Sequence, residues 1–413
     1  MNRRQFIKGA ASAGAAGVLG GSSPGAEAPA LPAGSADAPG ILRLGDALKS
    51  PVKVASIEVL EIGGNHFIRS RSADGAAGVA MTNERIAYLL PILQQLVIPY
   101  FIGEDARDLE SLIGGVYRAR SNYKLAGLAF WNPVGWVEFS LLDLLGRAAG
   151  RSVGDLLGGV VRREVAVYMS SMRRDTTPEA EVEWVGRRLA ETGAGAVKLK
   201  VGGRMSRNAD AAPGRSEKLA ALARRTFGDK MTIYVDANGS YDSARAIEVG
   251  RMLESHGVAF FEEPCPFEEL EETKRAADAL AVPVAGGEQD ASIPRFDWMI
   301  RNRVVDVVQP DVNYNGGFVR TLQVARLAAA AGMPITPHNP ATGFREAYVV
   351  HFASVVPGAG PFMEYNAAPA RPEPWLSPAL DVKNGVIQVP PGPGLGLEID
   401  PAYLAKAKVV GEK

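Results

Sequence analysis

The 413-residue sequence has a single cysteine, Cys265, and only four histidines. An intramolecular disulfide needs two cysteines, so none can form, and a cysteine-rich zinc site or a catalytic thiol pair is excluded as well. An excess of charge is also missing, because 45 Lys and Arg are balanced by 46 Asp and Glu, for a formal net charge of −1. Nucleic-acid binding depends on a basic surface, so we do not expect a nucleic-acid partner.

No apolar run is long enough to span a bilayer, and the first residues predict an export signal instead. Arg3 and Arg4 stand directly before an apolar pair, and a weakly apolar run rich in Ala and Gly follows from Gly9 to Gly21. This pattern predicts a twin-arginine signal peptide at residues 1–28, followed by a linker at residues 29–51. The alternative is a disordered N-terminus with a chance arginine pair. From this signal we expect the twin-arginine export machinery as a partner and the periplasm as the destination. That route carries folded proteins.

From residue 165 onward, short apolar runs rich in β-branched residues alternate with stretches of helical composition. Polar residues follow these runs at intervals of 23 to 27 positions. One strand, one helix and two loops need about that length, so the period predicts parallel strands with crossover helices. Eight such runs predict a closed (β/α) barrel, whose active site lies at the carboxyl ends of the strands. An open doubly wound sheet is the competing topology, but it would gather its chemistry at one switch point. The expected strands are Val165–Met169, Ala196–Val201, Thr232–Ala237, Ala259–Glu262, Val282–Gly287, Val304–Gln309, Pro334–Pro337 and Pro361–Glu364.

Residues 52–164 predict an α+β module in front of the barrel, which we place at residues 165–366. The Pro-rich residues 367–413 are too short for a domain, and we expect them to pack back on this module, with a hairpin around Asn384–Gly385. The expected strands of the module are Val54–Ile62, Ile68–Arg71 and Gly78–Met81, and its expected helices are Asn83–Gln95, Ala106–Tyr117 and Pro133–Ala149.

Three carboxylates, Asp236, Glu262 and Glu288, follow three successive expected strands. Adjacent strands lie about 4.8 Å apart, so the three side chains should converge at the mouth of the barrel. They would repel one another unless a cation neutralised them, and an all-oxygen set without thiols favours Mg²⁺. The alternative is that each is a helix cap or a surface acid, which would have to hold for three strands in register.

Candidate acid and base groups accompany the carboxylates. Lys198 and Lys200 share one face of their strand by its period of two, and both should point into the mouth. A neighbouring ammonium, desolvation and a nearby cation all disfavour the charged form, so one lysine could act as a base. Asp311 and His338 follow the sixth and seventh strands, and an Asp beside a His would orient it as a second acid or base. The alternatives are solvated lysines at a strand end and a buried structural histidine.

A metal between two bases suits one chemistry: removal of the proton next to a carboxylate creates an enediolate, whose charge Mg²⁺ stabilises. The sequence resembles the enolase superfamily in its mandelate racemase branch, in which a Lys or His base works with Mg²⁺. The resemblance covers about residues 53–400. The stretches that carry it are AVKLKVGG, YVDANGSY, FFEEP, AGGEQD, QPDVNYNGG, TPHNP and FMEYN, and outside the barrel VEFSLLDLLGRAAGRSVGDLLGG and VPPGPGLGLEID.

The resemblance implies a (β/α)7β barrel with an N-terminal α+β capping domain that the C-terminal segment completes. It implies one Mg²⁺ per subunit, a homo-oligomer, and specificity loops at residues 63–78, with Arg69, and 121–124, with Tyr123. An arginine there could pair with a second carboxylate or a sugar hydroxyl; a solvated loop is the alternative. The resemblance implies that Mg²⁺ is bound by Asp236, Glu262 and Glu288. It implies that Lys200, with Lys198 beside it, is the base for one face of the substrate, and that Asp311 and His338 form the dyad for the other face. It also implies that Glu364 holds the substrate carboxylate and that the substrate is contacted by Asn238, Arg69 and Tyr123.

Muconate cycloisomerases and dipeptide epimerases of this branch carry a lysine on the sixth strand, where this chain has Asp311. The resemblance therefore implies a Mg²⁺-dependent acid-sugar dehydratase, a hydro-lyase that abstracts the proton α to a carboxylate and eliminates the β-hydroxyl. A racemase or epimerase of a 2-hydroxy acid would use the same two bases. An exported sugar-acid-binding protein without activity is a further alternative. The sequence does not indicate which acid sugar is the substrate.

Overall fold

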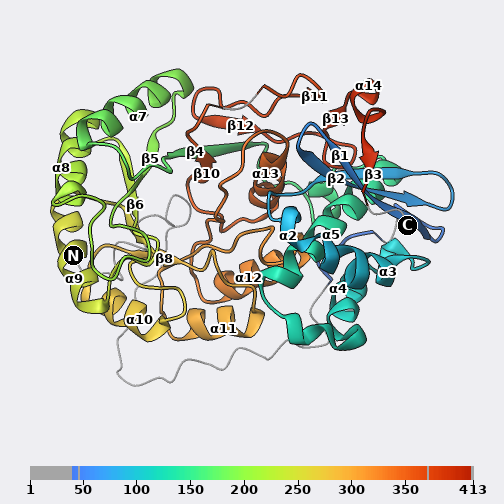
Figure 1. The fold of residues 1–413 in the computed structure, drawn as a ribbon, viewed down its shortest axis with the longest axis horizontal. Coiled ribbons are helices and arrows are strands. Elements are labelled where there is room, and N and C mark those ends of the chain that lie inside the picture. The colour runs from blue at the N-terminus through green and yellow to red at the C-terminus, as the bar shows by residue number, and fades with distance from the viewer. Residues whose placement is uncertain (1–39, 45–46, 370–371, 411–413) are drawn as a thin grey trace, which may run out of the picture.

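The computed structural model describes residues 40–44, 47–369 and 372–410, so the predicted signal peptide and most of the linker lie outside the described residues. A curled sheet of parallel strands, with helices around it, forms the larger part of the structure (Figure 1). Its strands follow the order β10-β4-β5-β6-β7-β8-β9, and β12 adds an antiparallel partner to β4. The strands are β4 (Glu164–Ser170), β5 (Ala196–Lys200), β6 (Thr232–Asp236), β7 (Phe260–Glu262), β8 (Val284–Gly286), β9 (Val307–Val308), β10 (Met363–Asn366) and β12 (Val386–Gln388).

The expected strand Pro334–Pro337 is absent as a regular strand. Ile335 makes only isolated bridges, to Val308 and to Ala359. Proline has no backbone N–H, so the prolines at both ends of this run cannot donate to a ladder. The segment nevertheless lies beside β9, because the backbone N–H of Val308 donates to the carbonyl of Pro334.

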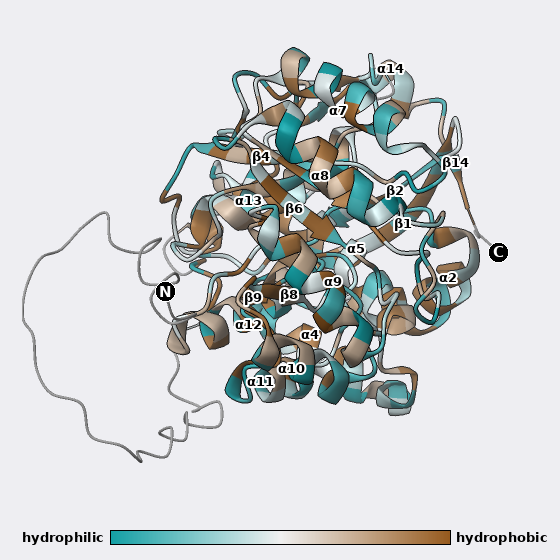
Figure 2. Ribbon diagram, turned by 90° about the vertical axis from the view of Figure 1, so that its left-hand side faces the viewer, coloured by the Kyte–Doolittle hydropathy of each residue, from teal (hydrophilic) through white to brown (hydrophobic). Residues whose placement is uncertain are grey.

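Helices follow the strands and cover the outside of the sheet (Figure 1). Several begin with a capping side chain, such as Thr177, Asp242 and Ser292, whose oxygen accepts a backbone N–H of the first turn. Figure 2 shows hydrophilic and hydrophobic residues mixed along α8 and α9, as in amphipathic helices with one buried side. These helices are α7 (Pro178–Thr192), α8 (Arg215–Phe227), α9 (Ser243–Ser255), α10 (Leu270–Ala279), α11 (Ile293–Arg301), α12 (Phe318–Ala330) and α13 (Glu346–Val355).

A second, antiparallel sheet comes from both ends of the described chain. Its order is β14-β1-β2-β3, so the C-terminal strand β14 pairs with β1, with Leu60 opposite Val409. Gly78 lies against α5 so closely that an added Cβ would meet the Leu144 nitrogen at 2.2 Å, and only glycine fits there. The elements are β1 (Val54–Ile62), β2 (Asn65–Ser72), β3 (Ala77–Met81), α2 (Ile86–Ile92), α3 (Ile98–Phe101), α4 (Leu109–Arg118), α5 (Leu128–Ala149), α6 (Val153–Leu156), β11 (Leu376–Ser377), β13 (Glu398–Ile399), α14 (Pro401–Leu404) and β14 (Lys408–Val409).

Two local expectations need correction, and a third is confirmed. The expected loop 63–78 is largely sheet, because β2 begins at Asn65 after a turn whose two glycines, Gly63 and Gly64, have positive φ. Helix α5 begins at Leu128, five residues before the expected start. The hairpin expected around Asn384–Gly385 is present as a tight turn, because both residues have positive φ and Lys383 and Val386 exchange backbone hydrogen bonds across it. The strand after the turn also pairs with β4. Among the described residues, no helix is both long and apolar enough to cross a membrane.

Candidate active site

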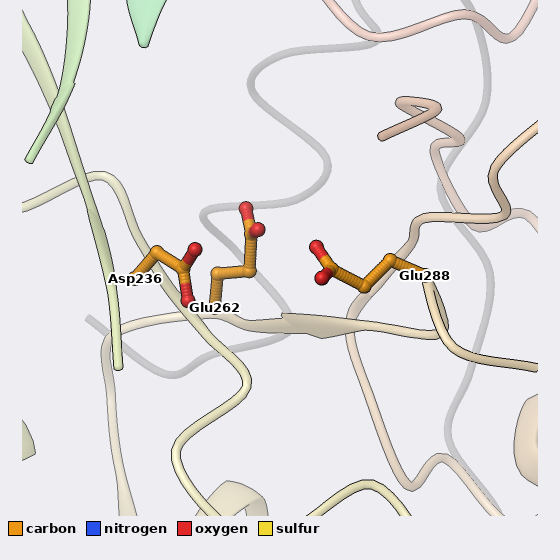
Figure 3. Close-up of side chains that lie close together, drawn as sticks. All are labelled: Asp236, Glu262 and Glu288. Carbon is orange, nitrogen blue, oxygen red and sulfur yellow. The ribbon is translucent and has the colours of Figure 1, made fainter. Parts of the chain in front are cut away.

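Three carboxylates converge at the carboxyl ends of neighbouring strands. Asp236 ends β6, Glu262 ends β7, and Glu288 follows β8 by two residues. Parallel pairing puts Asp236 beside Glu262, and the three side chains point toward one another (Figure 3). One oxygen of each lies within 4.8 Å of the others, and all three residues are buried.

The surroundings of this triad, Asp236, Glu262 and Glu288, suit a cation. Burial and the neighbouring carboxylates raise the pKa of Glu262 to about 8, although Lys198 opposes this. Burial also acts on Asp236, but the charges of Lys200 and Lys198 outweigh it and hold the pKa of this carboxyl well below its usual range. The Glu288 Oε2 atom is buried and accepts no hydrogen bond from the described residues. Closely packed, incompletely paired oxygens without any thiol fit a hard ion such as Mg²⁺.

Lys198 is fully buried between two carboxylates. Its Nζ lies 2.8 Å from both carboxylate oxygens of Glu262 and 2.8 Å from Oε1 of Glu364. Burial acts to lower the pKa of Lys198, but these two carboxylates raise it well above the usual value. The expectation that an ammonium neighbour, burial and a nearby cation disfavour the charged form is therefore wrong for Lys198, because two carboxylates face its amine.

Lys200 lies two residues further along β5, at the Asp236 end of the triad. Its Nζ contacts Oδ2 of Asp236 and lies 3.4 Å from Oδ1 of Asn238. The side chain is only 5% exposed, so its amine faces the site and not bulk water. Asn238 is tied to the same carboxylate, since its backbone N–H donates to Asp236 Oδ1 at 2.7 Å. The lysine is thus placed beside the triad at Asp236.

Asp311 and His338 form a pair beside Glu288. His338 Nδ1 lies 2.8 Å from Asp311 Oδ2, and Nε2 lies 3.5 Å from Glu288 Oε2. The other oxygen of Asp311 accepts the backbone N–H groups of Asn313 and Tyr314, which fixes the carboxylate. Burial lowers the pKa of His338, but the carboxylates around it, Glu288 foremost, outweigh this and raise it to about 10.

Glu364 lies on β10 and contacts residues from several other segments of the site. Its carboxylate accepts Ser170 Oγ at 2.6 Å and the Asn339 backbone N–H at 2.8 Å, besides the ion pair with Lys198. Burial would raise the pKa of Glu364, but Lys198 and His338 outweigh burial and lower it to about 2. The carboxylate is therefore charged and firmly held.

Several residues at the site were not predicted. Ser170 ends β4 one residue after the expected end of that strand, so a search of strand ends extended by one residue would find it. Gln309 donates to Glu262 Oε2 at 2.9 Å, and its place directly after β9 was a similar signal. Arg174 donates to Asn238 Oδ1 at 2.7 Å from a loop, where no periodicity marks it.

Two predicted substrate contacts are not brought to this site. Arg69 donates to Glu58 on β1 at 2.8 Å, which is its cross-strand neighbour in the antiparallel sheet. Tyr123 is 48% exposed and packs against the ring of Tyr117, with 6.3 Å between ring centroids. The structure therefore gives Arg69 a structural partner and leaves Tyr123 at the surface.

Comparison with known proteins identifies relatives that match most of the chain. A family model described as enolase C-terminal domain-like matches residues 180–403, and a twin-arginine translocation pathway signal model matches residues 1–20. Arabinonate dehydratase of Saccharolobus solfataricus is 30% identical over 311 residues, which are 74% of this chain and 80% of that protein. D-galactarolactone cycloisomerase of Agrobacterium fabrum is 31% identical over 313 residues, 73% of this chain and 80% of that protein.

A solved structure has the same fold. It is a mandelate racemase/muconate lactonizing protein from Paracoccus denitrificans in complex with magnesium, with a TM-score of 0.80 and 26% identity, and it matches over 87% of this chain and 99% of its own. The fold is thus the barrel of these proteins, and the chain carries a twin-arginine signal sequence. Family match, relatives and fold agree, and this chain belongs to the enolase superfamily.

Proposed function

We propose that this protein is a Mg²⁺-dependent acid-sugar dehydratase. The observation that carries the proposal is the position of the carboxylate triad between two proton-transfer groups, Lys200 at Asp236 and His338 at Glu288. The relatives support the substrate class, since one of them is an arabinonate dehydratase.

The triad would hold the metal. Mg²⁺ bound there would neutralise the negative charge that develops on the substrate carboxylate as the α-proton leaves. Lys198, held charged by Glu262 and Glu364, would donate to an oxygen of the same substrate carboxylate. This set of contacts orients the substrate with its α-carbon between the two proton-transfer groups.

The two groups divide the reaction between them. In its neutral form Lys200 takes the α-proton at Nζ as the C–H bond breaks. Asp311 accepts the Nδ1 proton of His338, so Nε2 is the nitrogen that faces the substrate. It donates a proton to the β-hydroxyl as the C–O bond breaks, which releases water and leaves an enol that tautomerises to a keto acid.

A racemase or epimerase is the second candidate, because the same two groups at opposite ends of the triad could return a proton to the other face. An NMR screen of aldonates and aldarates with Mg²⁺ in D₂O separates the candidates. A dehydratase exchanges the α-proton and forms a keto acid, whereas a racemase exchanges it and inverts the carbon without loss of water. If no substrate in the set loses its α-proton, the protein is a binding protein and our proposal is wrong.

The protein is proposed to act in the periplasm, because a twin-arginine signal matches residues 1–20. Lysine lacks the planar guanidinium fork of arginine, so the double change Arg3→Lys/Arg4→Lys should leave the protein in the cytoplasm. Fractionation followed by immunoblotting measures this, with Lys8→Arg as the matched control that keeps the pair. Normal export of the double variant would refute the assignment.

A further inference from the structure

Three arginines surround the loop that follows β4, and two of them have clear structural partners. Arg173 lies 3.7 Å from Glu181 and covers the ring of Trp184. Arg215 donates to backbone carbonyl groups, including that of Lys200 at 2.9 Å. These two guanidinium groups hold the loop to the barrel.

Arg174 forms no ion pair with a carboxylate of the described residues, and neither does Arg215. It differs from both because a buried part of its guanidinium group has no partner among the described residues. Its Nη2 donates to Asn238 Oδ1 at 2.7 Å and lies 3.5 Å from the backbone oxygen of Asp236. Its Nε is buried and has no hydrogen-bond partner in the described part of the chain. The same Asn238 oxygen lies 3.4 Å from Lys200 Nζ, so the guanidinium group stands next to the proposed base.

A partly buried cation whose donors are incompletely paired is unfavourable, and an anion that binds there is correspondingly favoured. The protein therefore supplies, at the mouth of the barrel, a guanidinium group that forms no ion pair with a carboxylate of the described residues. Its fork geometry matches a carboxylate.

We propose that Arg174 binds a second carboxylate at the far end of the substrate, so that the enzyme prefers aldarates, which are diacids, to aldonates. This inference rests on the proposed function, in which the first carboxylate faces the triad and Lys198. A terminal hydroxymethyl group would leave the guanidinium charge unpaired, and that loss is the basis of the discrimination.

Arg85 is the competing cation, on the side of His338. Its guanidinium group donates to the hydroxyls of Tyr88 and Tyr314, at 2.8 and 2.9 Å, and the Tyr314 ring centroid lies 6.0 Å from that of His338. It also lacks an ion pair with the described carboxylates. We favour Arg174 because Asn238 links it to Lys200, whereas two tyrosine hydroxyls already occupy Arg85.

The test compares an aldarate with the aldonate of the same hydroxyl configuration, in the wild type and in Arg174→Gln. We expect the wild type to have the higher kcat/KM on the aldarate, and Arg174→Gln to lose on the order of 10- to 100-fold there, mostly through KM. The ratio of kcat/KM on the aldarate to kcat/KM on the aldonate is the readout, and it should fall in this variant. Arg174→Lys, which keeps the charge without the fork, should recover part of the loss. Arg173→Gln is the matched control, since it removes the neighbouring charge that Glu181 already balances.

The outcomes are distinct. A fall in kcat on both substrates would make Arg174 a residue that only positions Asn238, and would overturn the inference. Loss of aldarate preference in Arg85→Gln, with Arg174→Gln unaffected, would move the subsite to the other side and overturn it too. If aldonates react and aldarates do not, the inference fails while the proposed function stands. If neither class loses an α-proton, the proposed function itself fails.

Discussion

Lys200→Ala should lose both exchange of the α-proton with D₂O and dehydration, whereas His338→Asn should lose dehydration and keep exchange. General acid or base help is worth about 10²–10⁴-fold, so each turnover should fall by at least that range. The patterns differ because Lys200, beside Asp236, takes the proton, and His338, beside Glu288, assists the leaving hydroxyl. NMR in D₂O measures both partial reactions in one sample.

The controls for this experiment are matched in residue type. Lys218→Ala and His256→Asn remove an exposed lysine and a partly exposed histidine and should react like the wild type. Because Lys200 contacts a member of the triad, the Mg²⁺ affinity of Lys200→Ala is measured as well and should be nearly retained. The reverse pattern would make His338 the base, and full dehydration by both variants would refute the mechanism.

Glu262→Gln should weaken Mg²⁺ binding by at least 10- to 100-fold, the range seen when groups that merely support a metal ligand are removed. Calorimetric titration measures the affinity, with the exposed Glu61→Gln as control. Glu262 also pairs with Lys198, so Glu288→Gln, which leaves that ion pair intact, provides a second variant. An unchanged affinity in both variants would place the metal elsewhere.

Removal of the metal should stop the reaction without unfolding the protein. The triad lies at the ends of strands whose own side chains form the core, so the fold does not depend on the ion. EDTA should therefore abolish turnover while the circular dichroism spectrum is retained, and added Mg²⁺ should restore activity. Activity that survives EDTA would contradict the proposed cofactor.

The barrel and the convergence of the triad could be predicted because both depend on one-dimensional patterns. Parallel strands of similar length bring their last residues to one edge, so the positions of Asp236 and Glu262 in the sequence were sufficient. The ion pair of Arg69 could not be predicted in this way. It depends on the antiparallel register that places Glu58 opposite, and that register follows from a two-glycine turn where a long loop was expected.

Charge states and loop side chains were beyond the same reasoning. The raised pKa of Lys198 comes from Glu262 and Glu364, which lie 64 and 166 positions away along the chain. Arg174 belongs to a segment without periodicity, and its direction is set by packing against Asn238. The run Pro334–Pro337 was predicted at the correct place in the sheet, but as a regular strand. Its two prolines lack N–H donors, so the run makes only isolated bridges.

The pairing of β14 with β1 constrains the order of events in the cell. The N-terminal sheet gains its last strand only when Lys408–Val409, which is made after every other described strand, returns to Leu60–Glu61. Until the ribosome has released this strand, β1 is an open edge that other chains can pair with. The twin-arginine signal at residues 1–20 precedes β1, yet a route that carries folded proteins must wait until β14 has been made. Chains truncated before β14 would therefore keep the export signal but lack the strand that completes the N-terminal sheet, and we expect them not to be exported.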